Sequence, residues 1–460
     1  MSFISTRGEA LPTDLPGAVF RGLAPDGGLY MPRACPLLGE EALGKLCRRA
    51  WPTLAADVLE QLIPNELAGK ALQELTAAAL DFPVPLVHLG GRVFVLELFH
   101  GPTLAFKDFG ARFLARLMDH YRKAGDPVTT ILTATSGDTG GAVAQAFHGL
   151  DGTRALVLFP DGKVTPRQER QFSTLGGNVT AIAVQGDFDD CQRLAKEAFR
   201  MGARNRPEGP GHNGPGPFPE HPVLTSANSI NVGRFLPQTT YFFRLWQELS
   251  ETRHNKTEIL VSVPSGNFGN LAAGLLARAM GLSELTFLAA TNENDVVPEY
   301  LQTGVFKPRP SIPTLSTAMD VGDPSNLARI RYLYGDDVRA LRRDVVGQRV
   351  TDRATRELIR RIWEERGYLM DPHSAVGMVA LEQELARRPR SLGVVLATAH
   401  PAKFAEVVEP VIGESVPIPP ELARCLDAER VVIPMEPRQE DLQELLRAPP
   451  AGPKGSTPAT

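Results

Sequence analysis

The chain of 460 residues is 43% hydrophobic and 22% charged, a composition typical of a globular protein with a substantial core. Its length predicts about two to three domains. The formal net charge of −4 and the scattered basic residues argue against a nucleic-acid-binding protein. No apolar run reaches the roughly 18 residues of a membrane span. The N-terminal residues carry charges where a signal peptide would be apolar, so we expect a cytoplasmic protein.

The cysteines and histidines predict neither disulfides nor a metal site. Cys35, Cys47, Cys191 and Cys425 show no CxxC spacing and are too few to form a disulfide scaffold in a chain of this length. The nine histidines form no HExxH pattern. We therefore expect reduced thiols and no bound metal.

Residues 1–84 form the first predicted domain. A Gly/Pro-rich opening over 24–32 is followed by helical patterns over 41–50 and 66–80. Pro83 and Pro85 then disfavour a helix in the residues that precede them. The domain boundary is therefore placed after residue 84.

Residues 85–412 form the second predicted region, in which short apolar runs alternate with longer helical patterns. Continuous apolar runs suit strands that are buried on both faces, and helices between them suit a mostly parallel sheet. The sequence therefore predicts an α/β fold with helices covering the sheet. The predicted strands lie at 93–96, 129–133, 154–159, 179–184, 258–263, 286–290 and 393–397.

Two segments are expected to lack regular structure. Gly and Pro are dense over 202–222, which predicts a flexible surface loop. The second segment is the tail from residue 448, which has almost nothing to bury. This tail ends a predicted C-terminal extension over 413–460.

Lys107 is the first candidate functional residue. It opens a predicted helix, where the positive end of the helix dipole disfavours an ammonium group. Phe99, Phe106 and Phe109 are close in sequence and would desolvate the amine. Both effects lower the pKa of a lysine, as an amine nucleophile requires. By itself, this local sequence also fits a Lys107–Asp108 pair that is exposed to solvent at the surface.

Two strand–loop–helix segments are candidates for binding anions. In 131–147 an apolar strand leads through small hydroxyl residues and glycines into a helix, whose free N–H groups favour a carboxylate or a phosphate. The segment 259–277 repeats this design, and its uncharged loop suits a single phosphate monoester. Neither segment has the Rossmann or the Walker A pattern. Each could also be a simple glycine loop between a strand and a helix.

The combination is more specific than its parts. One lysine able to form an imine and two uncharged anion-binding loops match a pyridoxal-phosphate enzyme. The chain then resembles the threonine synthase family, most closely its bacterial and fungal branch, up to about residue 410. The motifs that carry the resemblance are HGPTLAFKDFG (100–110), TATSGDTG (133–140), SANSIN (226–231), VPSGNFGN (263–270), TLSTAMD (314–320), DPHSAVG (371–377) and LATAHPAKF (396–404).

The resemblance implies a tryptophan-synthase-β-like fold (fold type II), with pyridoxal 5'-phosphate in a cleft between two α/β subdomains. The lysine that binds the cofactor falls on Lys107, and the partner of the pyridine nitrogen falls on Thr398. Asp138 is expected to cap a helix or to contact the substrate amine or a cofactor hydroxyl. The loop for the cofactor phosphate falls on Gly266, Asn267, Phe268, Gly269 and Asn270. Candidate substrate contacts are Thr103, Ser136, Gly137, Asp138, Thr139, Lys163, Arg167, Ser229 and Asn231.

The implied activity is that of a carbon–oxygen lyase that converts O-phospho-L-homoserine and water to L-threonine and phosphate, the last step of threonine biosynthesis. A phospholyase that releases 2-oxobutyrate, ammonia and phosphate would share the same motifs. A third hypothesis is a catalytically inactive binding protein, against which the presence of Lys107 argues. We expect a monomer or a homodimer without nucleic-acid or membrane partners.

Overall fold

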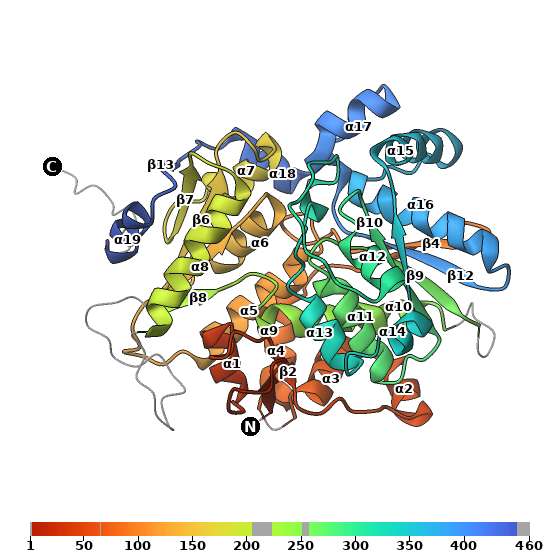
Figure 1. Cartoon of the computed structure of the whole chain (residues 1–460), viewed down its shortest axis with the longest axis horizontal. Helices are drawn as coiled ribbons and strands as arrows, with labels where there is room; N and C mark the ends of the chain where they lie inside the picture. Colours follow the sequence, from red (N-terminus) through yellow and green to blue (C-terminus); the bar gives the residue numbers. More distant parts are fainter. Residues whose placement is uncertain (1, 65, 205–222, 251–256, 449–460) are drawn as a thin grey trace.

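The computed structural model describes residues 2–64, 66–204, 223–250 and 257–448. Two parallel-rich sheets with helices on their faces lie side by side, above a largely helical N-terminal segment (Figure 1). The predicted α/β fold class is confirmed. Each of the predicted strands is present, and its ends lie within one residue of the expected ones.

The larger sheet has the strand order β11-β10-β9-β12-β4-β3 within the described residues. Its strands run parallel except for β3, which pairs antiparallel with β4. The central strands β9 and β10 are buried along their whole length because helices cover both faces of the sheet. The strands are β3 (Leu86–Gly90), β4 (Val93–Glu97), β9 (Ile259–Pro264), β10 (Leu285–Thr291), β11 (Val345–Arg349) and β12 (Leu392–Ala397).

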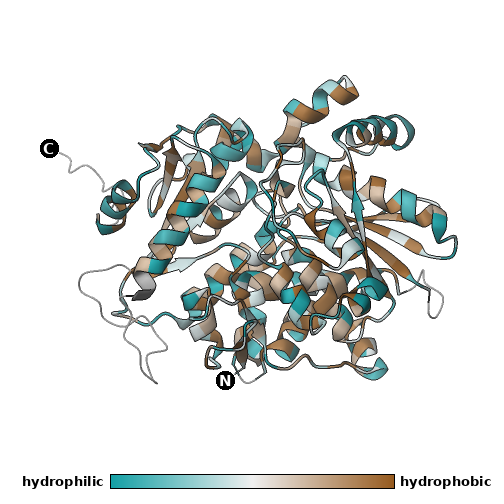
Figure 2. Cartoon of the chain, in the orientation of Figure 1, coloured by the Kyte–Doolittle hydropathy of each residue, from teal (hydrophilic) through white to brown (hydrophobic). Residues whose placement is uncertain are grey.

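The smaller sheet has the order β13-β7-β6-β5-β8 over the described part of the chain, and all its pairs are parallel. Its central strands β5 and β6 are again buried throughout. The strands of the larger sheet, at the right of Figure 2, are largely brown and therefore hydrophobic. The strands are β5 (Thr129–Ala134), β6 (Thr153–Pro160), β7 (Val179–Val184), β8 (Val223–Ser226) and β13 (Ile433–Met435).

Helices pack on both sheets and between them. The helix α8 (Phe188–Arg204) contacts the smaller sheet from one face, and α6 (Asp138–Phe147) and α7 (Pro166–Ser173) lie on the other. The helix α16 (Pro372–Arg387) packs on the larger sheet, beneath the mostly polar α15 (Asp352–Arg366). The remaining helices of this region are α5 (Lys107–Tyr121), α9 (Val232–Phe235), η1 (Leu236–Thr239), α10 (Thr240–Glu248), α11 (Gly269–Ala279), α12 (Val296–Thr303), η2 (Thr317–Met319), α13 (Leu327–Leu333), α14 (Val338–Asp344), η3 (Pro401–Phe404) and α17 (Ala405–Ile412).

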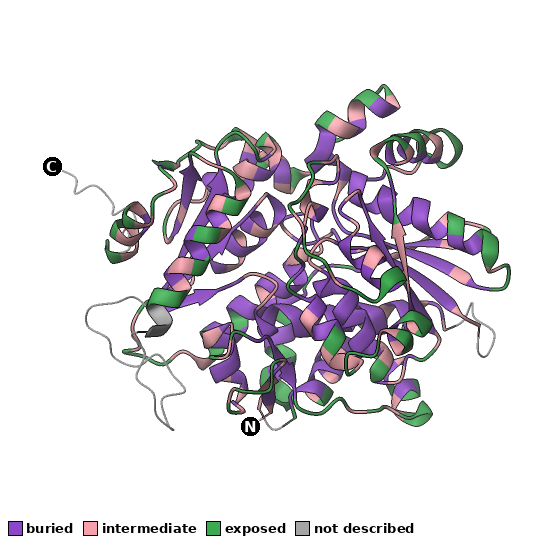
Figure 3. Ribbon diagram, in the orientation of Figure 1, coloured by how far each residue is buried: buried purple, intermediate pink, exposed green. Residues whose placement is uncertain are grey.

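The N-terminal segment packs against the region over residues 85–412 through a shared core. Its buried side chains belong to the same hydrophobic cluster as those of α5 and α10, and they form the purple base of the molecule in Figure 3. Trp51 contacts Phe109 of α5, with ring centroids 6.0 Å apart. The helical patterns over 41–50 and 66–80 correspond to α2 and α4. The elements are β1 (Phe3–Ser5), α1 (Leu15–Arg21), β2 (Tyr30–Pro32), α2 (Glu40–Leu46), α3 (Thr53–Leu62) and α4 (Gly69–Ala79).

The predicted C-terminal extension completes the smaller sheet. Its strand β13 pairs with β7, and α19 (Gln439–Arg447) packs on α8. Arg154 of β6 donates to the carbonyl oxygens of Leu445 and Ala448 at the end of α19, over 2.9 and 2.7 Å. The helix α18 (Pro420–Asp427) packs on α7. From residue 449 onward, the predicted tail lies outside the described residues. Of the predicted loop over 202–222, only the first three residues are described, and they continue α8.

Candidate active site

The carboxyl ends of neighbouring parallel strands border one large cavity. The strands β9, β12 and β4 lie side by side and end at the same edge of the larger sheet. A cavity of about 2820 Å³ opens there, and it is also lined by the residues that follow β5 of the smaller sheet. Ligands of open α/β sheets bind beyond such strand ends. The predicted site residues that line this cavity are Lys107, Ser136, Asp138, Thr139, Ser229, Gly266, Asn267, Phe268, Gly269, Asn270 and Thr398.

Lys107 is the first residue of α5 and lies in the cavity wall. The loop before it is fixed by Asp108, whose carboxylate accepts hydrogen bonds from the backbone N–H and the hydroxyl of Thr103 over 2.9 and 2.6 Å. The loss of solvation lowers the pKa of Lys107 to about 8. Asp138 opposes this shift, and the cations Arg234 and Lys403 add to it. A larger fraction of the amine is therefore neutral near neutral pH than in an ordinary lysine.

The loop over 266–270 turns sharply between β9 and α11. Phe268 has a left-handed φ of 59°, and the first turn of α11 begins directly after it. The amide of Asn267 is held at both ends: its Nδ2 donates to Oγ of Ser229 over 2.6 Å, and its Oδ1 accepts from the N–H of Ser325 over 2.6 Å. The loop thus combines a helix N-terminus with neutral side chains, which is a site for an anion.

Thr398 follows β12 and is almost fully buried beside the cavity. Its backbone N–H donates to Oγ of Ser374 over 3.2 Å. Ser374 in turn bonds to Asp371, the residue that caps α16. The position of Thr398 is therefore set by the neighbouring helix as well as by the sheet.

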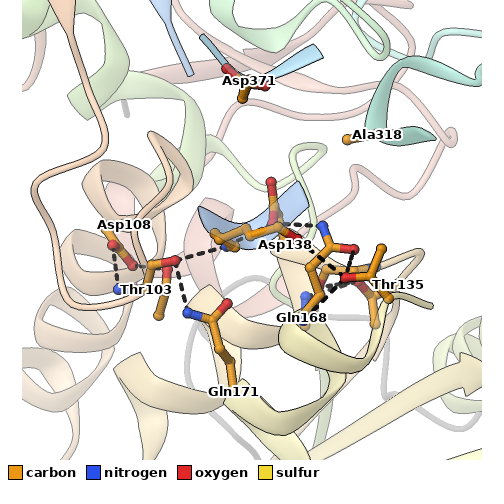
Figure 4. Close-up of polar contacts among 12 residues, drawn as sticks. Thr103, Asp108, Thr135, Asp138, Gln168, Gln171, Ala318 and Asp371 are labelled. Carbon is orange, nitrogen blue, oxygen red and sulfur yellow. Dashed lines mark hydrogen bonds and ion pairs between the residues drawn. The ribbon is translucent and has the colours of Figure 1, made fainter. Parts of the chain in front are cut away.

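The start of α6 differs from the prediction for Asp138. Of the alternatives predicted for Asp138, the capping role is wrong, because Asp138 is already the first helical residue and Gly137 occupies the cap position. A contact with the substrate amine or a cofactor hydroxyl stays a prediction. The hydroxyl of Thr135 accepts from the N–H groups of Gly137 and Gly140 over 2.9 and 2.8 Å and so takes the capping role. The Asp138 carboxylate instead lies 2.7 Å from Nζ of Lys403 and accepts from Nε2 of Gln168 over 2.8 Å (Figure 4).

Burial alone would raise the pKa of Asp138. The neighbouring ammonium groups of Lys403 and Lys107 outweigh this effect and hold the pKa well below its ordinary value. Asp138 is therefore ionised across the physiological range, next to a helix N-terminus that the sequence predicts to bind an anion.

Several predicted substrate contacts do not line the cavity as the described residues form it. Lys163 is exposed to solvent, and Asn231 uses its amide to cap α9 and to hold Val19. Thr103 is buried, and its carbonyl oxygen accepts from Lys403 and Gln171. Gly137 and Arg167 also lie outside the lining; the guanidinium of Arg167 donates to a backbone carbonyl of η3. Their roles in substrate binding stay predictions.

Comparisons with known proteins place the chain in a family. Residues 2–80 match the family model described as "Threonine synthase N terminus", residues 80–398 match "Pyridoxal-phosphate dependent enzyme", and residues 374–446 match "Threonine synthase, C-terminal". The threonine synthase of Escherichia coli is 43% identical over 89% of this chain and 91% of its own length. The chain belongs to the threonine synthase family.

Other members of this family extend the match. The threonine synthase of Schizosaccharomyces pombe is 32% identical over 94% of this chain and 95% of its own. The crystal structure of the Escherichia coli protein superposes with a TM-score of 0.87 at 39% identity, covering 97% of this chain and 99% of that one. The pyridoxal-phosphate-bound threonine synthase of Brucella melitensis has a TM-score of 0.85 at 33% identity, with the same coverage. The fold type II architecture implied by the resemblance is thereby confirmed.

The site fits the cofactor of the threonine synthase family, pyridoxal phosphate. A Cβ atom on Gly266 would lie 2.7 Å from the carbonyl oxygen of Ala318 and 2.8 Å from Cα of Met319, so only glycine leaves this loop open to the cavity. The loop offers N–H groups and neutral amides for a phosphate, and Lys107 supplies an amine in the same cavity. Among the described residues, no helix is long and apolar enough to cross a membrane, and no group of side chains could hold a metal ion.

The threonine synthase site also contains residues that sequence reasoning missed. Arg234 and Lys403 are buried cations near Lys107, and both are near or within quoted motifs, so that local sequence could have indicated them. No sequence motif indicates a role for Gln168. The guanidinium of Arg329 is fully buried over the ring of Phe235 and donates to backbone carbonyl oxygens, including that of Ser229 over 2.8 Å. Burial lowers the pKa of Arg329 to about 9.

Proposed function

We propose that the protein converts O-phospho-L-homoserine and water into L-threonine and phosphate. The observation that carries this proposal is one cavity lined by a desolvated lysine, a neutral loop for a phosphate and the N-terminus of α6. It occurs in a chain that shares 43% identity with a protein named threonine synthase over most of its length. In this reaction, phosphate leaves the γ carbon and water adds its hydroxyl group to the β carbon.

Pyridoxal phosphate, when bound, draws electrons from the α carbon of an amino acid and makes its proton removable. Lys107 would hold the cofactor, the 266–270 loop would bind its phosphate, and the hydroxyl of Thr398 would meet its ring nitrogen. With its amine free, Lys107 would accept the protons lost from the α and β carbons and return protons to the α carbon and to the γ carbon, which becomes the methyl group of threonine. A pKa of about 8 suits this role, because general acid–base catalysis is most efficient when the pKa lies near the working pH.

The start of α6 would bind the α-carboxylate of the substrate. Ser136 lies just before the helix and Thr139 lies in its first turn, and both line the cavity. The N–H groups of this turn that Thr135 does not already accept from lie at the positive end of the helix dipole. Such a site orients an amino acid with its α carbon toward Lys107. It also excludes amines that lack a carboxylate, because the N–H groups would then stay unpaired.

The leaving phosphate needs donors of its own. Of the residues predicted for this role, Ser229 lines the cavity next to Asn267, whereas Lys163 and Asn231 do not. Arg234 also lines the cavity, and its Nε is a buried donor without a partner among the described residues. We therefore assign Ser229 and Arg234 to the substrate phosphate, since a guanidinium is well suited to binding it.

Product identification tests the proposal. Purified protein loaded with pyridoxal phosphate is incubated with O-phospho-L-homoserine, and phosphate and the organic products are quantified. We expect one L-threonine for each phosphate released. Formation of 2-oxobutyrate and ammonia in place of threonine would identify the alternative phospholyase, and binding without phosphate release would identify a catalytically inactive binding protein.

Two further properties belong to the same proposal. A biosynthetic enzyme of this kind would act in the cytoplasm. The cavity is formed by a single chain, so either a monomer or a homodimer would be active. Light scattering of the loaded protein distinguishes these two assemblies.

A further inference from the structure

Lys403 links the two halves of the molecule beside the cavity. It lies in η3, a short loop after β12 of the larger sheet, and its side chain is fully buried. Its Nζ lies 2.7 Å from Oδ1 of Asp138 at the start of α6, next to the smaller sheet. The same Nζ donates to the carbonyl oxygen of Thr103 over 2.8 Å, in the loop that leads to Lys107.

The surroundings of Lys403 fix the position of this ammonium group. The guanidinium of Arg167 on α7 donates to the carbonyl oxygen of Ala402 over 2.7 Å, which ties η3 to the smaller sheet. Gln168, the next residue, donates to the same oxygen of Asp138 that Lys403 contacts. Figure 4 shows Asp138 and Gln168 joined in this way, with Thr103 held by Asp108 and Gln171 on the side of α5.

Asp138 poses an electrostatic problem for the proposed function. Its carboxylate lies in the cavity wall at the helix N-terminus that would bind the α-carboxylate of the substrate. Two carboxylates a few ångströms apart in a poorly hydrated site repel each other strongly. An unneutralised Asp138 would therefore weaken the binding of the substrate that this helix N-terminus is suited to hold.

We propose that Lys403 is a positioning residue for catalysis: its ammonium neutralises Asp138 and turns that carboxylate away from the α6 N-terminus, so that the N–H groups there can bind the carboxylate of the substrate. This inference rests on the proposed function. In this proposal, the buried pair Lys403–Asp138 determines the affinity for the substrate carboxylate, and Lys107 carries out the chemistry of bond cleavage.

The pair also acts on Lys107. The charged groups that face the Lys107 amine are Asp138 from α6, Arg234 from α9 and Lys403 from η3. Removing the Lys403 charge takes away a cation and leaves the Asp138 anion uncompensated. Both changes favour the protonated amine, so the pKa of Lys107 rises. Removing both charges together leaves only Arg234 and the loss of solvation, which keep the pKa low.

The test compares Lys403→Met, which preserves length and removes the charge, with the double variant Asp138→Asn/Lys403→Met. In the single variant, we expect KM for O-phospho-L-homoserine to rise about 30-fold at high pH, the lower end of what losing one partner of a buried charge pair costs. The rise should fade as the pH falls, because Asp138 without Lys403 becomes protonated more readily. In the double variant, KM should return to within about threefold of wild type at all pH values, because no charge remains to repel the substrate.

A second readout needs neither substrate nor cofactor. In the cofactor-free protein, Lys107 is modified with an amine-specific acylating reagent over a range of pH, and its modification is followed by mass spectrometry. We expect the midpoint for Lys107 to move upward in Lys403→Met and to stay at or below the wild-type value in the double variant. Thermal unfolding of each variant is recorded to separate loss of fold from loss of charge.

The proposal fails if KM rises equally in the single and double variants and does not depend on pH, since the pair would then be only structural. If Lys403→Met does not fold, Asp138→Asn carries the test: KM at or below wild type supports the proposal, and a tenfold rise overturns it. A wild-type protein that makes no threonine refutes the proposed function instead, and the acylation midpoints still report whether Lys403 and Asp138 control Lys107.

Discussion

The backbone N–H of Phe106 donates a hydrogen bond of 2.9 Å to the carbonyl oxygen of Thr398. The residue before Lys107, the lysine proposed to hold the cofactor, is thereby tied to the residue assigned to the pyridine nitrogen. A bridge between Ala105 and Ala399 adds a second link. The start of α5 and the residue after β12, which would contact two ends of one pyridoxal ring, therefore cannot move independently. A change at either residue is expected to affect cofactor binding as well as catalysis.

Lys107→Ala is expected to lower threonine formation by about a thousandfold or more, because no other group would supply the nucleophilic amine. The variant should still bind pyridoxal phosphate weakly through the 266–270 loop. Turnover and cofactor absorbance are measured together. Lys123→Ala, which removes an exposed lysine just beyond the end of α5, is the control and should match wild type. Normal turnover in the Lys107 variant would remove this residue from its role.

Cofactor uptake should depend on pH through Lys107. Only the neutral amine reacts, and burial lowers its pKa to about 8, so the initial rate of uptake by cofactor-free protein should rise with pH and reach half its maximum near pH 8. Below that pH, the protonated fraction grows and uptake slows. Stopped-flow absorbance from about pH 6.5 to about 10.5 measures the profile. A midpoint at the ordinary lysine value would show that the amine is fully hydrated.

Asn267→Asp is expected to weaken cofactor binding by about 2 kcal/mol, or about 30-fold in Kd. The new carboxylate keeps the bond from the N–H of Ser325 but loses the donor to Ser229, and it adds a negative charge beside a phosphate. Ser229→Ala is the matched control, because it removes the same hydrogen bond without adding charge, and its effect should be smaller. Equal Kd values for Asn267→Asp and wild type, from equilibrium titration, would mean that the phosphate binds elsewhere.

Thr398→Asp tests the electronic role of a neutral partner. A carboxylate favours a protonated pyridine nitrogen, and a protonated ring withdraws electrons more strongly from the substrate. We expect slower threonine formation, a new absorbance at longer wavelength during turnover, and a shift of product toward 2-oxobutyrate. Thr398→Asn has nearly the same volume and no charge, so it accounts for the effects of shape. If Asp and Asn variants behave alike, Thr398 does not govern the ring nitrogen.

Gly266→Ala is expected to cost about 1–3 kcal/mol of stability, because the added methyl group meets backbone atoms of Ala318 and Met319 that cannot turn away. Cofactor affinity should fall as well. Gly44→Ala is the comparison: Gly44 lies inside α2 with open space around it, so alanine there should raise the free energy of unfolding by about 0.5–1 kcal/mol. Denaturant titration with and without cofactor measures both.

How far the sequence predicts this molecule depends on how local each signal is. Lys107 and the 266–270 loop follow from a strand, a loop and a helix that are consecutive in the chain, so their pattern is visible before folding. The pair Lys403–Asp138 joins segments from opposite ends of the catalytic region, and no periodicity relates them. The capping prediction for Asp138 was wrong for the same reason, since a partner distant in sequence takes its carboxylate.

Residues 413–448 were the least predictable part of the described chain. The strand β13 spans only three residues and contains Pro434, which weakens any strand pattern. It can pair because it lies at the edge of the sheet, where one side of the strand needs no partner. The position of β13 depends on β7, and that of the following helix α19 depends on Arg154; neither partner is visible from the segment itself.

The late position of β13 has a consequence for how the protein is made. The strands β5 to β8 are synthesised before residue 227, but the strand that covers the free edge of β7 is made more than 200 residues later. Throughout most of synthesis this edge would be open to pairing with another chain. A chain interrupted before Ile433 would keep every residue assigned to the cavity and still expose an aggregation-prone edge, so the final segment covers this edge in the finished protein and adds no residue to the cavity.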